Sequence, residues 1–434
     1  MFSLRNKGSF WSFKGGILTP AVIFMVSSMM VNAGNYGYNV WLGREVGPEI
    51  FAETGLLVNL LLLLSFLGMT FQIVSAKYVV DLDNEAEQAF SGWIALISVL
   101  TGTLLALFLW FGAGRLTSFF QLSSPWVVRS FALGIPFYFL LSVQRGLVQG
   151  KERFLPLSAS YQVEMLGRVI LTFVLLLVFG VPAGIAVALG IAFSIAIACF
   201  SSGWVSFRFR WQALGDVKKP ILYFFLFTAG YEAVQIVINY FDILLVKHSF
   251  TPLEAGYYTS LSFIGRMIYF VTWMFVMLLL PSVINRKKKG QPYEHLLTRY
   301  VMYISLFVAF AVLSCYFMGD MLVVLVFGEE YTAIGAYLWK YGLATGLFAV
   351  ANVFSYYHLS LGNYRPVLIT GAMAVAQSIC LLAYHDSFHQ LIDVQVLFMG
   401  LALVSQWIYQ ATKYDVAKPW EKDISSHLKK TSIH

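Results

Sequence analysis

Two apolar segments of the sequence carry rows of polar side chains at helical spacing. Positions 28, 32, 35 and 39 are separated by four, three and four residues, so their side chains lie on one face of a helix. Lipid offers no hydrogen-bond partners, so such a row has to face protein or water. One or two polar groups are enough to join helices by hydrogen bonds, and the longer rows favour a hydrated cavity. The rows are Ser28, Asn32, Asn35 and Asn39, and Thr228, Glu232, Gln235, Asn239 and Asp242.

Arg266 lies in a further apolar segment, at a depth similar to that of Glu232. One expectation is an ion pair between these two side chains. The alternative is that Arg266 faces the cavity and binds an anionic group, because a guanidinium can hold a phosphate through two hydrogen bonds. Glu232 and Asp242 would then be available to bind a coupling cation, Na+ or H+.

Glu164 precedes Arg168 by four residues in another apolar segment. An acid placed one turn before a base is the favourable order for an ion pair along a helix. We therefore expect a structural ion pair between Glu164 and Arg168, with a role at the cavity as the alternative.

Signatures of catalysis and metal binding are weak. The stretch Gly146-x-x-x-Gly150-Lys151 is one residue too short for an ATP-binding phosphate loop and lacks its Ser or Thr. Residues 385–393 contain two His and two Asp, but no further ligand accompanies them. The sequence therefore predicts a protein that is not an enzyme, with no catalytic residues, no metal site and no cofactor beyond a coupling cation.

Membrane-spanning helices are the elements that position these residues. Of the 434 residues, 59% are apolar and 12% are charged, against roughly 45–50% and about 25% in soluble domains. This composition excludes an ordinary soluble enzyme, a disordered protein and a disulfide scaffold. One crossing takes about 20 apolar residues, so we expect an all-α polytopic membrane protein with about 12 transmembrane helices. The predicted spans are residues 17–42, 51–78, 90–112, 125–149, 155–180, 182–206, 220–248, 254–284, 300–327, 332–361, 366–384 and 391–411.

Basic residues determine the predicted orientation. With the N-terminus inside, most of the 29 Lys and Arg residues fall in inner loops and tails, as the positive-inside rule requires. We expect a multi-pass membrane protein with both termini in the cytoplasm and an even number of spans. The net charge of +7 then reflects topology and anionic headgroups rather than nucleic acid. The exceptions at outer ends are Arg44, Arg115, Arg129, Lys247 and Lys340.

The sequence also contains a weak internal repeat. Pro20 aligns with Pro220 at an offset of 200 residues, and the two polar rows align after them. The pattern Leu-x-x-Gly-x-x-Arg occurs at residues 147–153 and again at 359–365. Two matches in the same order indicate a duplicated six-helix unit. We predict an N-terminal six-helix bundle (1–210), a C-terminal six-helix bundle (211–412) and a cytoplasmic basic tail (413–434).

Three stretches resemble motifs of a known family. They are residues 42–49 (LGREVGPE), 239–247 (NYFDILLVK) and 252–258 (PLEAGYY). Together with the span count and order, they resemble the polysaccharide transporter family, whose Wzx-type members are lipid-linked oligosaccharide flippases. This family is a branch of the multidrug/oligosaccharidyl-lipid/polysaccharide exporter superfamily. The first outer loop is longer here, through residues 51–55, and no motif identifies a sugar.

The resemblance implies two pseudo-symmetric six-helix bundles forming a V-shaped central cavity that works by alternating access. It implies a flippase of the bacterial plasma (inner) membrane that translocates an oligosaccharide on undecaprenyl pyrophosphate across this membrane in polysaccharide biosynthesis. The implied partners are this lipid-linked oligosaccharide, membrane lipids and other polysaccharide-assembly proteins, with no nucleic acid. The expected substrate-cavity residues are Asn32, Asn35, Asn39, Glu232, Gln235, Asn239, Asp242 and Arg266.

Two other functions remain open on the sequence. A cation-coupled multidrug exporter of the same superfamily would have a cavity dominated by acidic and apolar side chains. A membrane-embedded polysaccharide-assembly enzyme would need acidic and basic catalytic groups at one membrane face. Essential Glu232 and Asp242 together with a dispensable Arg266 would favour the exporter.

Overall fold

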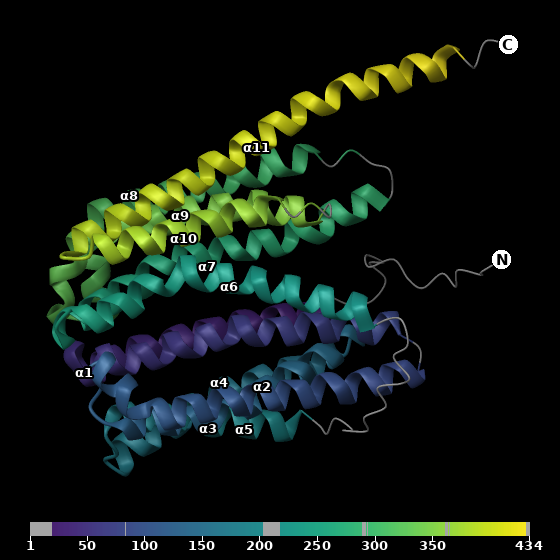
Figure 1. The fold of residues 1–434 in the computed structure, drawn as a ribbon. Coiled ribbons are helices and arrows are strands. Elements are labelled where there is room, and N and C mark those ends of the chain that lie inside the picture. The colour runs from purple at the N-terminus through teal and green to yellow at the C-terminus, as the bar shows by residue number, and fades with distance from the viewer. Residues whose placement is uncertain are drawn as a thin grey trace. The chain divides into compact units, whose positions relative to one another are not determined.

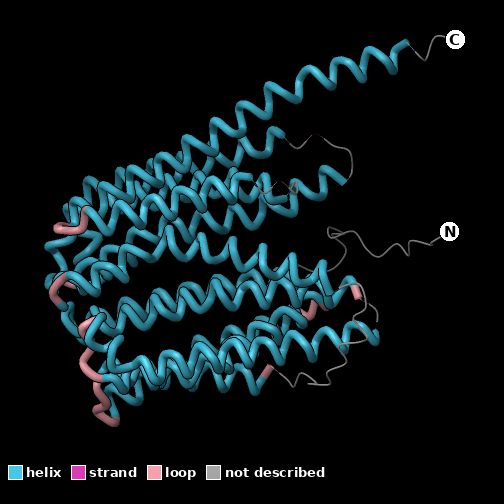
Figure 2. The backbone as a smooth tube through the Cα atoms, in the orientation of Figure 1, coloured by secondary structure: helices cyan, strands magenta, loops and turns pink. Residues whose placement is uncertain are grey.

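Long helices make up the described structure. The computed structural model describes residues 20–82, 84–202, 218–288, 292, 294–360, 363 and 365–430, and this part of the chain contains no strand (Figures 1 and 2). A helix satisfies its backbone groups within one segment, as the bilayer interior requires. The helices are α1 (Pro20–Asp81), α2 (Asn84–Phe119), α3 (Pro125–Gly150), α4 (Phe154–Phe173), the π-helical turn η1 (Val174–Val178), α5 (Ala183–Ser201), α6 (Lys218–Ser249), α7 (Pro252–Lys288), α8 (Glu294–Phe327), the 3-10 helix η3 (Glu329–Ile334), α9 (Gly335–Ser360), α10 (Arg365–Ala383) and α11 (Phe388–Lys430).

Among the described helices, nine are long and apolar enough to cross a membrane. One of them, α1, has 62 residues and consists of two helices that meet at a kink at Gly47. Their combined length of about 90 Å is enough for two crossings of a core of roughly 30 Å. The predicted spans 155–180 and 182–206 correspond to α4 with η1 and to α5; residues 203–206 lie outside the described part, as do residues 17–19 of the first span. The expectation of an all-α membrane fold with about twelve crossing segments is confirmed.

The helix α1 is interrupted once, at Gly47, where φ is 71° and ψ is 171°. Glycine adopts a positive φ without steric cost, and the following Pro48 has no N–H with which to continue the helical hydrogen bonds. The interruption falls between predicted spans 17–42 and 51–78. The turn expected between these spans therefore lies at Gly47, where two helices meet within α1.

The chain divides into two compact units by packing. Unit 1 contains the described parts of Met1–Leu42 and Leu60–Ala229, and unit 2 contains Gly43–Asn59 and the described parts of Gly230–His434. This division describes packing, so the duplicated halves 1–210 and 211–412 stay a prediction. The predicted basic tail begins within α11; its side chains and residues 431–434 lie outside the described part, as does part of the second Leu-x-x-Gly-x-x-Arg pattern.

Two glycines allow α1 and α3 to approach closely in unit 1. A Cβ atom at Gly146 would overlap the carbonyl oxygen of Gln72, and one at Gly150 would overlap that of Ala76. Small residues four apart commonly bring membrane helices together in this way. The two glycines of the stretch 146–151, which was compared with an ATP-binding phosphate loop, therefore serve helix packing.

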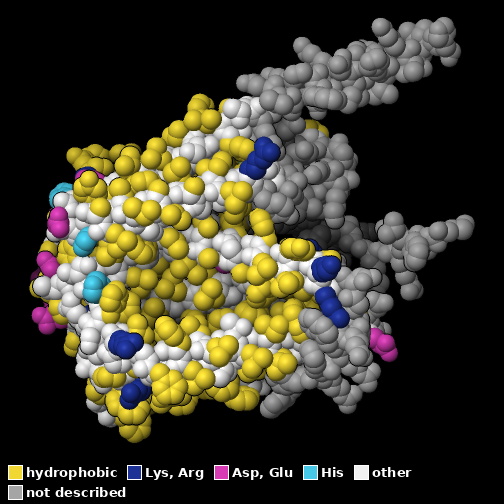
Figure 3. Space-filling view, viewed as in Figure 1, with side chains coloured by type: hydrophobic (Ala, Val, Ile, Leu, Met, Phe, Trp, Pro, Cys, Tyr) yellow, Lys and Arg dark blue, Asp and Glu magenta, His cyan; other side chains and the backbone are white. Residues whose placement is uncertain are grey.

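Apolar side chains also cover the outside of the helices. Figure 3 shows hydrophobic side chains over much of the visible face. On α2, Leu104, Phe108 and Phe111 are exposed, and on α8 Phe310 and Phe317 are exposed. Contiguous apolar surface of this kind is unusual on a soluble monomer and is the surface that a membrane protein presents to lipid.

Candidate functional site

Arg266 on α7 is the centre of a buried polar network in unit 2. Arg266 is only 4% exposed. Its Nη2 lies 3.4 Å from Oδ1 of Asp242 and also donates to the backbone oxygen of Asn239, while Nη1 donates to Oδ1 of Asn59 at 3.2 Å. The centre of the Tyr240 ring lies 4.2 Å from the guanidinium carbon. The positive charge is therefore compensated on several sides.

Asp242 on α6 accepts hydrogen bonds from side chains on two other helices, α7 and α9. Its Oδ2 accepts hydrogen bonds from the hydroxyl of Tyr258 on α7 at 3.1 Å and from that of Tyr341 on α9 at 2.9 Å. Gln395 on α11 donates to the Tyr258 oxygen at 3.2 Å. Charge-assisted hydrogen bonds of this kind are stronger than neutral ones, so the network fixes α6, α7, α9 and α11 around one carboxylate.

The ion pair expected between Arg266 and Glu232 is wrong, because Arg266 pairs with Asp242 instead. Asp242 follows Glu232 on α6 at a distance of about 15 Å along the helix axis. One guanidinium cannot reach both carboxylates. The sequence placed Arg266 and Glu232 at similar depth but could not indicate which turn of α6 faces Arg266.

Glu232 is buried on α6, and no ion pair or hydrogen bond joins it to another described residue. It lies close enough to the phenols of Tyr231, Tyr269 and Tyr356 to interact with them electrostatically. Placing a charged carboxylate in a membrane interior is costly unless it is paired, and such residues mark ion or proton pathways. Glu232 is therefore the acidic member of the second row that remains available for a cation or proton.

Gln235 and Asn239, also in the second row, make contacts within unit 2. Gln235 exchanges hydrogen bonds with Asn352 of α9 at 3.3 and 3.4 Å, and Asn352 donates to the hydroxyl of Tyr269 at 3.0 Å. Asn239 donates to the backbone oxygen of Gln235 at 2.8 Å. These contacts are the helix-joining role considered for the row, and the assignment of these residues to a substrate cavity stays a prediction.

The first polar row lies in unit 1, where its asparagines differ in exposure. Asn32 is exposed, Asn35 is half-buried and Asn39 is buried. Oδ1 of Asn35 accepts a hydrogen bond from Nη2 of Arg168 on α4, and Asn39 donates to the backbone oxygen of Asn35 at 2.9 Å. Asn32 is thus the asparagine of this row most accessible from outside unit 1, and its role in a cavity also stays a prediction.

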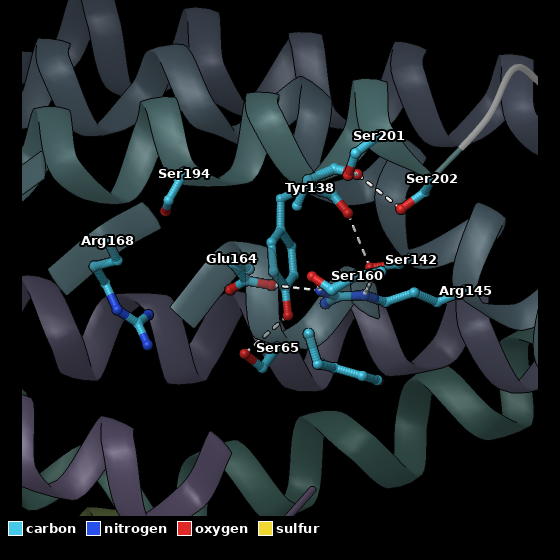
Figure 4. Close-up of polar contacts among 12 residues, drawn as sticks. Ser65, Tyr138, Ser142, Arg145, Ser160, Glu164, Arg168, Ser194, Ser201 and Ser202 are labelled. Carbon is cyan, nitrogen blue, oxygen red and sulfur yellow. Dashed lines mark hydrogen bonds and ion pairs between the residues drawn. The ribbon is translucent and has the colours of Figure 1, made fainter. Parts of the chain in front are cut away.

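The ion pair expected between Glu164 and Arg168 is also wrong. Oε2 of Glu164 lies 2.8 Å from Nη2 of Arg145 on α3, and Arg168 is directed to Asn35 instead. Figure 4 shows Glu164 beside Arg145, with Arg168 apart from this pair. Side chains four residues apart share a helix face, but here each has a better-placed partner on another helix.

Arg145 is a buried residue near the end of the predicted span 125–149. Its Nε donates to Oγ of Ser160 at 2.7 Å, and its Nη2 donates to the backbone oxygen of Ser160 at 3.0 Å. Its guanidinium carbon lies 3.8 Å from the centre of the Tyr161 ring. Figure 4 shows the surrounding hydroxyls, including that of Tyr138, which donates to Ser65 at 2.9 Å. The one available signal was the adjoining Gly146, which marks a close helix contact.

The described residues contain no group of three or more His, Cys, Asp or Glu side chains that could hold a metal ion. Among the described residues, the buried Arg145 and Arg266 are paired with carboxylates, whereas the buried carboxyl group of Glu232 has no ion pair or hydrogen bond. Such an arrangement can bind a proton or a small cation at Glu232, and the paired arginines position neighbouring helices.

The sequence matches one family model, described as polysaccharide biosynthesis protein, over residues 18–283. A search of curated proteins found no match to this chain.

Solved structures share the fold at low sequence identity. A multidrug resistance MATE family transporter of the MOP superfamily, in an inward-facing conformation, is 12% identical with a TM-score of 0.75, covering 92% of this chain and 99% of its own. The lipid II flippase MurJ, in an inward closed conformation, is 14% identical with a TM-score of 0.72, covering 91% of this chain and 87% of its own. A MOP superfamily transporter from Pyrococcus furiosus is 12% identical with a TM-score of 0.55, over 92% and 94% of the two chains.

Proposed function

The chain belongs to the polysaccharide biosynthesis protein family, and on that premise we propose that it is a flippase for a lipid-linked oligosaccharide. The proposed substrate is an oligosaccharide on an undecaprenyl pyrophosphate carrier, moved across the bacterial plasma membrane by alternating access. The product is a precursor for a surface or secreted polysaccharide.

The observation that carries this proposal is a polysaccharide-biosynthesis family match on a chain with membrane-crossing helices. Its fold is shared with structures described as transporters and as a lipid II flippase. Movement of a membrane-bound intermediate is the step of polysaccharide assembly that fits these features.

Glu232 is the proposed coupling residue for Na+ or H+. Asp242, the other acid of the second row, already faces Arg266 and accepts two tyrosine hydroxyls. Glu232 has no such partners among the described residues. A carboxyl group that must gain and lose a cation during each cycle cannot also be held permanently by an arginine.

The roles that we propose for Arg266 and Asn32 follow the same reasoning. Arg266 is engaged by Asp242, Asn59 and the Asn239 backbone, so we assign it to positioning helices rather than to holding the pyrophosphate. Asn32, exposed on α1, is the better candidate for contact with sugar hydroxyls. Both chain ends are proposed to lie in the cytoplasm.

Deletion of the gene in its own host tests the proposal. We expect the lipid-linked oligosaccharide to accumulate on the cytoplasmic side and the amount of surface polymer to fall. The wild-type gene should return both amounts to their original levels. Restoration should fail with Glu232→Gln at an equal protein level. Polymer export that continues unchanged in the deletion strain, with no related gene present, would contradict the proposal.

A cation-coupled multidrug exporter is the second candidate. It is supported by the TM-score of 0.75 to the MATE family transporter, although 12% identity shows a shared fold alone. Under this alternative, the deletion strain would export its polymer normally and become sensitive to cationic drugs.

A further inference from the structure

Arg129 lies between two tryptophans where α2 meets α3 in unit 1. Its guanidinium carbon is 5.1 Å from the ring centre of Trp126 and 5.8 Å from that of Trp110. The two indole rings lie 6.4 Å apart and perpendicular to each other. Nε of Arg129 is buried and has no hydrogen-bond partner among the described residues. A guanidinium has five N–H donors, so the Arg129 side chain makes fewer hydrogen bonds than it could.

The neighbouring segments of the sequence contain no carboxylate for Arg129. No Asp or Glu occurs between Glu87 and Glu152, a stretch that includes all of α3 and most of α2. None occurs between Glu164 and Asp216, a stretch that includes all of α5, which packs against α3. Glu164 itself pairs with Arg145, about 24 Å from Arg129 along α3. A counter-ion for Arg129 therefore has to come from outside this part of the chain.

The cluster is accessible from the lipid-facing surface. Trp126 is 54% exposed, and Phe111, next to Trp110 in α2, is 82% exposed. Tryptophans at the ends of membrane helices lie at the level of the lipid headgroups, where the lipid phosphates also lie. Arg129 is moreover one of the few arginines at the side where the positive-inside rule disfavours them, so a phosphate partner accounts for its position.

We propose that Arg129, Trp110 and Trp126 form a binding site for the anionic phosphate of a membrane lipid. The guanidinium would donate charge-assisted hydrogen bonds to the phosphate oxygens, while the two indoles hold the guanidinium by cation–π contact. Two lipids carry this chemistry: an anionic phospholipid, and the polyprenyl phosphate carrier. Only the second source rests on the proposed function.

Native mass spectrometry of the full-length protein in detergent tests the site. The probes are phosphatidylglycerol, undecaprenyl phosphate and, as a neutral control, phosphatidylcholine. We expect Arg129→Gln to weaken the binding of at least one anionic probe roughly tenfold, the loss of about one charge-assisted hydrogen-bond pair. Loss of phosphatidylglycerol binding identifies bulk phospholipid as the ligand, and loss of undecaprenyl phosphate binding alone identifies the carrier.

Two further variants make the test independent of folding. Arg115→Gln removes an exposed arginine from the same end of α2 and should change binding less than twofold. Trp126→Leu removes the exposed indole and should weaken binding several-fold without removing a charge. If Arg129→Gln and Trp126→Leu, both monodisperse on size exclusion, bind the two anionic probes like wild type, the site does not exist.

Discussion

Arg266 and Asp242 face each other at 3.4 Å in the interior of unit 2, although they lie on different helices. The pair is extended by Asn59 on the guanidinium side and by Tyr258 and Tyr341 on the carboxylate side. Each charge therefore has partners that satisfy its remaining hydrogen-bonding groups. A buried pair of this quality is costly to break on one side, because the other charge is then left uncompensated.

Breaking this pair should destabilise unit 2, and removing both charges should cost less. We expect Arg266→Gln and Asp242→Asn each to lower the free energy of unfolding by about 3–5 kcal/mol. The double variant should recover a large part of this loss, since no charge remains buried alone. Unfolding in detergent, analysed as a double-mutant cycle, measures the coupling. Strictly additive losses would show that the two side chains do not act as a pair.

Arg266→Lys should fail to replace arginine in the same measurement. A lysine ammonium is a compact charge and lacks the planar group that donates to Asp242, Asn59 and the Asn239 backbone together. We expect stability between that of wild type and Arg266→Gln. A lysine variant as stable as wild type would mean that only the charge matters.

Substitutions of Glu232 and of Glu164 should affect different properties, polymer export in the first case and stability in the second. Glu232 lacks a partner among the described residues, whereas Glu164 pairs with Arg145 at 2.8 Å. Glu232→Gln should therefore reduce polymer export strongly and change the unfolding midpoint little. Glu164→Gln should lower stability by about 3 kcal/mol and, with protein levels matched, retain most of the export. The reverse pattern would assign coupling to Glu164.

The packing of α1 against α3 gives a prediction with an internal control. Gly146→Ala places a Cβ against the carbonyl oxygen of Gln72, whereas Gly114→Ala on α2 meets no atom within 4 Å. We expect Gly146→Ala to destabilise unit 1 by about 1–3 kcal/mol through overpacking. Gly114→Ala should be neutral or stabilising by up to about 1 kcal/mol, because alanine favours the helix. Equal unfolding midpoints for the two variants would exclude the close contact.

Local patterns in the sequence were sufficient for the helices but not for the partners of the charged residues. Long apolar runs have one low-energy form in a membrane, so the spans and the interruption near Gly47 could be anticipated. Which carboxylate Arg266 meets depends on the rotation and height of α6 against α7, and no local pattern contains that information. The same limitation explains why Glu164 was paired with Arg168, its neighbour on the helix, rather than with Arg145.

Arg145 shows a second limitation. Its position near the end of the predicted span 125–149 is typical of a residue that determines membrane orientation, and only the adjoining Gly146 indicated a helix contact instead. Asn35, in contrast, was expected to face protein or water, and it accepts a hydrogen bond from Arg168. Helical spacing predicted the shared face of the polar rows, and the tertiary contacts decide what each face meets.

Translocation by the purified protein is the most direct test of the proposed flippase function. The protein is reconstituted into vesicles with lipid-linked oligosaccharide isolated from the deletion strain, and a membrane-impermeant sugar-modifying reagent is added outside. The initially protected fraction of the oligosaccharide should become accessible in vesicles with wild-type protein, faster under a Na+ or H+ gradient, and remain protected with Glu232→Gln. Protection that persists with correctly folded wild-type protein, as in protein-free vesicles, would contradict the proposed function.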